Sequence, residues 1–70
     1  MTTVQKIFDN DLEVTISRSP IFGGVIIKAS NDKYANRLVI PIVEIEKVNT
    51  DIISVVVDRL VDDIDRKENE

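Results

Sequence analysis

The 70-residue sequence contains no cysteine and no histidine. Disulfides, thiolate nucleophiles, imidazole acid–base catalysis and the common zinc-finger spacings are therefore excluded. A chain of this length buries only about 60% of the surface that its unfolded form exposes. Small domains that lack disulfides and metals often gain stability by oligomerisation. The composition thus predicts one small domain over residues 1–70 that self-associates, with a dimer favoured and no cofactor.

Long apolar runs are also missing. No stretch approaches the roughly 18 apolar residues of a membrane span, and no apolar segment follows the first basic residue, Lys6. Apolar residues make up 43% of the chain and charged residues 31%, which is typical of soluble globular proteins. We expect a soluble, cytoplasmic protein, in a cell or in an infected host cell, with no membrane partner.

The net charge of −4 is unevenly distributed. The first 40 residues carry five basic and four acidic side chains, whereas the last 30 carry four basic and nine acidic ones. An acidic half repels nucleic acid, and the other half is only weakly basic. The charge balance therefore favours a protein partner over nucleic acid.

Four segments have the features of short strands. Residues 4–8 are a plausible short strand with Val4, Lys6 and Phe8 on one face. Residues 12–17 alternate cleanly, which predicts that Leu12, Val14 and Ile16 face the core. Residues 25–30 follow a Pro/Gly loop, and residues 34–40 are expected to turn Leu38 and Ile40 inward. The connections are short, so antiparallel pairing is expected, because a parallel crossover needs a dozen or more residues.

The C-terminal part of the chain has helical periodicity. Apolar residues recur from Ile53 to Ile64 at the spacing of one helix face. The favoured helix spans residues 41–67, because Pro41 suits a first helical turn and Ile42 and Ile45 continue the apolar stripe. In the alternative, residues 42–48 stay extended and the helix begins near residue 50; residues 68–70 fray in both cases. The predicted fold is α+β: an antiparallel sheet of three to four short strands, followed by one C-terminal helix packed across it.

The apolar stripe of this helix is wider than one sheet requires. A helix that lies on a single sheet needs an apolar arc of about 100°, whereas this stripe covers about half the circumference. The surplus predicts a homo-oligomer assembled through the helix. The predicted interface consists of six residues: Ile53, Val56, Val57, Leu60, Val61 and Ile64.

Acidic residues are the main candidates for chemistry. Asp58, Asp62 and Asp65 share one helix face and could attract a hard cation, but a straight helix face rarely offers six oxygen ligands. We therefore expect a water-facing acidic surface and no metal site. Asp9 and Asp11 are explained by the turn they flank, and no base is available to activate a serine. No catalytic residue is predicted, and we expect a protein that is not an enzyme.

Nucleic-acid binding is the alternative. Several strands followed by one C-terminal helix is the order of elements in the PC4-like single-stranded DNA-binding domains, which this layout resembles over most of the chain. That resemblance implies binding on the outer sheet face, with base stacking on aromatic residues. The residues that would form this face are Lys6, Arg18, Lys28, Tyr34 and Arg37, with Phe22 as a further stacking residue.

A loop bounded by Pro20 and Gly23 carries Ile21 and Phe22, two large apolar residues where polar ones are usual. If exposed, they would form a partner-binding tip; if folded back, they would close one end of the core. Taken together, the sequence predicts a small, non-catalytic, regulatory interaction protein that acts by binding another protein. Short acidic chains of this kind are frequent among phage and mobile-element accessory proteins.

Overall fold

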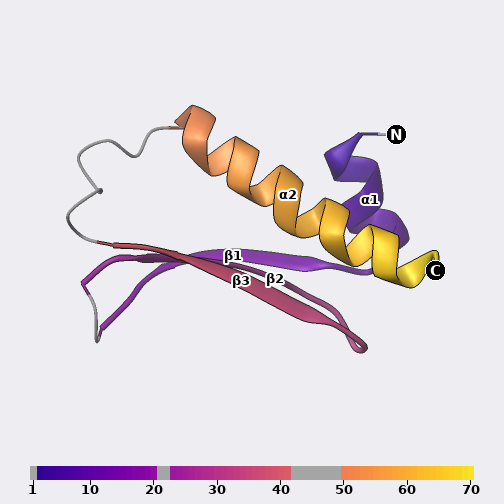
Figure 1. Ribbon diagram of the computed structural model, residues 1–70, viewed down its shortest axis with the longest axis horizontal. Coiled ribbons are helices and arrows are strands. Elements are labelled where there is room, and N and C mark those ends of the chain that lie inside the picture. The colour runs from indigo at the N-terminus through magenta and orange to yellow at the C-terminus, as the bar shows by residue number, and fades with distance from the viewer. Residues whose placement is uncertain (1, 21–22, 42–49) are drawn as a thin grey trace.

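A computed structural model describes residues 2–20, 23–41 and 50–70 of the chain. Along the chain, the elements are α1 (Thr3–Asp9), β1 (Glu13–Arg18), β2 (Val25–Ser30), β3 (Ala35–Ile40) and α2 (Thr50–Glu68). The strands form one antiparallel sheet in the order β1-β2-β3, and α2 runs obliquely over one face of it (Figure 1). The predicted α+β class, with a three-stranded sheet and a C-terminal helix, is confirmed.

The strand register defines the two faces of the sheet. Ile16, Ile27 and Leu38 lie side by side across the three strands. Opposite residues of an antiparallel pair point to the same face, and alternate residues point to opposite faces. The face towards α2 therefore carries these apolar residues, and the outer face carries residues such as Lys28 and Arg37, which are also paired.

The core lies between this face and the helix. Ile27 of β2 and Val61 and Ile64 of α2 are fully buried. The complete set of buried apolar residues among those described is Leu12, Ile27, Ala29, Ile40, Leu60, Val61 and Ile64. Burial of such side chains contributes about 1.5–3 kcal/mol each, so this small group supplies most of the apolar stabilisation.

The prediction that Ile16 is a core residue was wrong. Its side chain is on the helix-facing side of the sheet, yet 57% of it is exposed. The reason is its position: β1 is an edge strand, and α2 packs over β2 and β3. Leu38, on the opposite edge strand, is also 37% exposed, whereas Ile40 is buried as expected.

The predicted strand at residues 4–8 was also wrong, because these residues belong to α1. A capping box starts this helix: the Thr2 side chain accepts from the Gln5 backbone N–H, and the Gln5 side chain accepts from the Thr2 backbone N–H. Asn10 ends it, and Asp11, at φ 52°, adopts the left-handed conformation that turns the chain into β1. Local capping has decided the structure of a segment whose alternation suggested a strand.

The described part of α2 begins at Thr50, and Pro41 has no regular secondary structure. The helix predicted to begin at Pro41 therefore does not begin there. Residues 42–49, for which helix and strand were the alternatives, lie outside the described residues. At its other end α2 continues to Glu68, so the predicted frayed tail is shorter by one residue.

Candidate functional site

A row of carboxylates follows one flank of α2 and contacts α1. The Thr3 hydroxyl donates to Asp58 Oδ1 at 2.6 Å, and the Lys6 ammonium donates to Asp62 Oδ1 at 3.0 Å. One turn further along α2, Asn10 Nδ2 donates to Asp65 Oδ1 at 2.9 Å. These acids are spaced at i, i+4 and i+7, so they lie on one side of the helix, and α1 runs alongside it (Figure 1).

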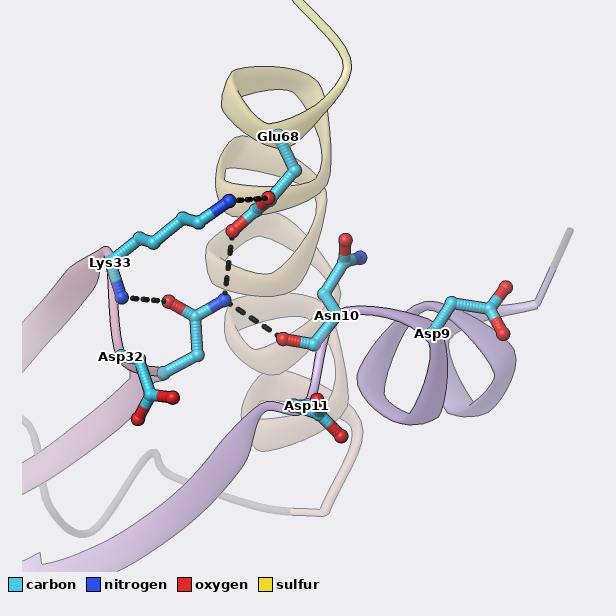
Figure 2. A pocket seen from close by; sticks show the side chains of 7 residues that line it. Asp9, Asn10, Asp11, Asp32, Lys33 and Glu68 are labelled. Atoms are coloured by element: carbon cyan, nitrogen blue, oxygen red, sulfur yellow. Dashed lines mark hydrogen bonds and ion pairs between the residues drawn. The ribbon is translucent and has the colours of Figure 1, made fainter.

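The row continues to the turn between β2 and β3. Asn31 Nδ2 donates to Glu68 Oε1 at 3.1 Å and to the backbone carbonyl of Asn10 at 2.8 Å. The Lys33 ammonium lies 3.7 Å from Glu68 Oε2. The Asn31 side chain thus joins the α1–β1 turn, the β2–β3 turn and the end of α2. Figure 2 shows Asn10, Lys33 and Glu68 at this junction. Three segments far apart in the sequence are thereby held at one corner.

Asp62 has the clearest electrostatic environment in this row. It accepts from Lys6 and, at 3.0 and 2.7 Å, from Nε and Nη2 of Arg66 one turn along the helix. Hydrogen bonds from Lys6 and Arg66 lower the pKa of Asp62 below its ordinary value, and the bond from Lys6 has the larger effect. The same contact with Asp62 raises the pKa of Arg66. Both groups are therefore charged over a wider pH range than isolated side chains.

The predicted water-facing acidic surface has a further role: Asp58 is exposed and Asp62 and Asp65 are half-buried, and all three also bond other parts of the chain. Asp58, Asp62 and Asp65 hold the N-terminal helix, which has no buried residue of its own. Their donors are other side chains of the same chain. Within the described ranges, no three acidic residues are arranged to hold a metal ion. The acids thus have a structural role, and this role explains their spacing.

Asp9 and Asp11, the other carboxylate pair considered, border an open hollow of about 170 Å³ beside Asp32 and Lys33. In Figure 2 the two carboxylates point in different directions from the α1–β1 turn. A pair that shares a proton must have its oxygens about 3 Å apart, so this arrangement does not form an acid–base pair.

The predicted interface residues of α2 face the chain's own sheet. Leu60, Val61 and Ile64 are buried in the core, and the other three predicted residues, Ile53, Val56 and Val57, are half-buried against it. The exposed apolar residues of α2 are instead Ile52 and Val55, at 39% and 66%. The exposed apolar surface of α2 therefore consists of residues other than the six that the apolar stripe predicted for the interface.

The five residues of the proposed nucleic-acid face do not lie on one surface. Lys6 is on α1 and is paired with Asp62, and Arg18 is in register with Val25 and Ile40 on the helix-facing side. Tyr34 is half-buried against the core, with the Lys67 ammonium 5.9 Å from its ring centroid. Only Lys28 and Arg37 share the outer face. Ile21 and Phe22, the predicted partner-binding tip, lie outside the described residues.

Among the described residues, six of the seven exposed large apolar side chains belong to elements on two flanks of the molecule, and the seventh, Val39, is on the outer face of the sheet. The α1/β1 flank carries Val4, Phe8 and Ile16, of which Phe8 is 76% exposed and Val4 61%. The α2/β3 flank carries Leu38, Ile52 and Val55. Val4 and Phe8 are one helical turn apart. This i, i+4 spacing is the sequence signal for an apolar face on a helix, although a strand was predicted for residues 4–8.

Comparison with known protein families, curated proteins and solved structures finds no match to this chain. None of the described helices is long and apolar enough to cross a membrane.

Proposed function

We propose that this chain is a small, non-catalytic interaction protein that forms a homodimer and acts by binding another protein. One observation carries the proposal. Among the described residues, seven large apolar side chains are exposed, and the same number of apolar residues is buried. Single exposed apolar residues are ordinary, whereas groups of them mark surfaces that bind other molecules.

The two flanks allow two contacts at once. The α1/β1 flank and the α2/β3 flank are at opposite edges of the sheet, because β1 and β3 are its edge strands. On α2, Asp62 bonds Lys6 of α1, and Asp63 bonds Asn36 of β3. These contacts are on different sides of the helix. A second copy on one flank leaves the other flank free. We assign the second copy to the α1/β1 flank, where Phe8, the more exposed of the two described aromatic residues, is located.

The polar surface supports a binding function rather than catalysis. The acidic row on α2, which was the strongest candidate for chemistry, is bonded to α1 and to the β2–β3 turn. A catalytic carboxylate must instead reach a substrate proton at about 2.6–3.2 Å. The contacts of this row stabilise the fold, so the function is assigned to the apolar flanks.

Two measurements test the proposal. Selection from a random peptide display library against the immobilised protein should enrich a peptide consensus that contains apolar anchor residues. Titration with a fluorescent single-stranded oligonucleotide should show no affinity, even at low salt, where phosphate contacts are strongest. Oligonucleotide binding that weakens steeply with salt, together with no enriched peptide, would establish nucleic-acid binding instead. Self-association is measured separately by sedimentation equilibrium.

A further inference from the structure

Two like charges face each other on the outer face of the sheet. Lys28 of β2 is directly opposite Arg37 of β3, and both side chains are exposed. Like charges in directly opposed positions destabilise a sheet. Within the described ranges, neither residue forms an ion pair with an acid, although the chain as a whole has a net charge of −4. This pair is therefore a locally basic site on an acidic protein.

The basic site borders a groove of mixed character. The groove lies between α2 and β3 and has a volume of about 380 Å³; its apolar lining is Leu38, Val55, Val56 and Leu60, and its polar lining is Asn36, Arg37, Arg59 and Asp63. A second, open hollow of about 280 Å³ lies beside Lys28 and Arg37. Arg37 borders both, so the β3 edge lies between the outer basic pair and a groove that offers apolar contacts at Leu38 and Val55.

The β3 edge is itself a binding element. As the last strand of the sheet in the described part of the chain, β3 has backbone N–H and C=O groups that face away from β2, and such an edge accepts an added strand. The side chains of an added strand alternate between the two faces. Those on the inner side would contact Leu38 and the groove, and those on the outer side would lie beside Arg37 and Lys28.

We infer that β3 binds an extended segment of a partner protein in which apolar and acidic residues alternate. The apolar residues fill the groove against Leu38 and Val55, and the acidic residues neutralise Arg37 and Lys28. This inference rests on the proposed protein-binding function and specifies the chemistry of the partner. Charge complementarity selects this partner, because the added carboxylates remove the repulsion that the free sheet contains.

The same charges disfavour two other occupants. A second copy paired antiparallel through β3 would bring the two Arg37 side chains together, since Arg37 is near the middle of the six-residue strand. Single-stranded nucleic acid needs aromatic residues for base stacking, and neither aromatic residue of the described ranges lies beside the basic pair: Tyr34 is half-buried against the core and Phe8 is on α1. Both occupants remain as outcomes of the test.

The test uses three labelled peptides with flanking Gly-Ser residues: alternating Val-Glu, alternating Val-Lys and alternating Ser-Glu. Fluorescence anisotropy at low salt should show binding of the Val-Glu peptide alone. Arg37→Glu should weaken this binding at least tenfold, whereas Arg18→Glu, at the end of the other edge strand, should change it less than twofold. Hydrogen exchange should show that the peptide protects the amides of β3 and not those of β1. Circular dichroism checks that each variant is folded, and Lys28→Glu replaces Arg37→Glu if the latter unfolds.

Each remaining outcome overturns the inference. Equal binding to the wild type and to Arg37→Glu, or to Lys28→Glu where that variant replaces it, would place the peptide elsewhere. Binding of an oligothymidine strand in preference to the Val-Glu peptide would assign the basic pair to nucleic acid. Protection of β3 on self-association alone would assign the edge to a second copy. If none of the three peptides binds but the display library still yields a consensus, the β3 site is refuted and the proposed function stands; if neither yields binding, both are refuted.

Discussion

Replacing Ile64 by valine tests whether α2 belongs to the core of its own chain. Ile64 is fully buried against the sheet. Loss of one buried methylene from such a site costs about 0.5–1.5 kcal/mol. In a domain of this size about 1 kcal/mol moves the melting temperature by about 4–8 °C, so the variant should melt roughly 2–12 °C lower. The larger change to alanine costs about 2–5 kcal/mol, which approaches the whole stability of a 70-residue domain, at about 0.05–0.15 kcal/mol per residue.

The matched control is Val55→Ala on the same helix. Val55 is 66% exposed, so its replacement forms no cavity, and the higher helix propensity of alanine favours the helix by up to about 0.7 kcal/mol. Thermal unfolding followed by circular dichroism, at one protein concentration, should therefore show an unchanged or slightly higher midpoint for this variant. If Ile64→Val leaves the midpoint unchanged while Val55→Ala lowers it, the assigned orientation of α2 is incorrect.

Three further predictions concern α1 and the turns. Lys6→Met should speed hydrogen exchange of the α1 amides while the β2 amides stay protected, because Lys6 links α1 to Asp62. The pKa of Asp62 is lowered in the folded state, so the ionised carboxylate stabilises the fold above about pH 4, and this contribution is lost as the pH falls through the folded-state pKa. Asp62→Asn should therefore flatten the dependence of stability on pH below about pH 4, measured by urea unfolding. Gly24→Ala should destabilise the protein by about 1–3 kcal/mol, because a Cβ at Gly24 would overlap the carbonyl oxygen of Ile40; a crystal structure with an undisturbed β3 end would contradict this.

The sheet could be predicted from the sequence because each strand must bury one face. The alternation of residues 12–17 and the faces of residues 25–30 gave the correct strands, with boundaries shifted by one residue or less. The exposure of Ile16 could not be predicted in this way. It depends on which strand lies at the edge and on how far α2 extends across the sheet, and neither is encoded in the local pattern.

The role of the acidic row was hidden for a different reason. The donors to Asp58 and Asp62 are Thr3 and Lys6, which are 55 and 56 residues away in the sequence. Periodicity places acids on one helix face but does not reveal what lies opposite them. For α1, the capping box of Thr2 and Gln5 was a readable signal, although a helix of 7 residues is too short for its period to be distinguished from strand alternation.

The most direct test of the account is the mass of the particle in solution, measured by sedimentation equilibrium on the wild type and on two variants with one substituted exposed residue each. The account predicts a wild-type particle of twice the 7.9 kDa chain mass at tens of micromolar. Phe8→Ser, on the α1/β1 flank, should be monomeric and folded, and Val55→Ser, on the α2/β3 flank, should remain dimeric. A wild type of single-chain mass, or a dimer that Phe8→Ser leaves intact, would contradict it.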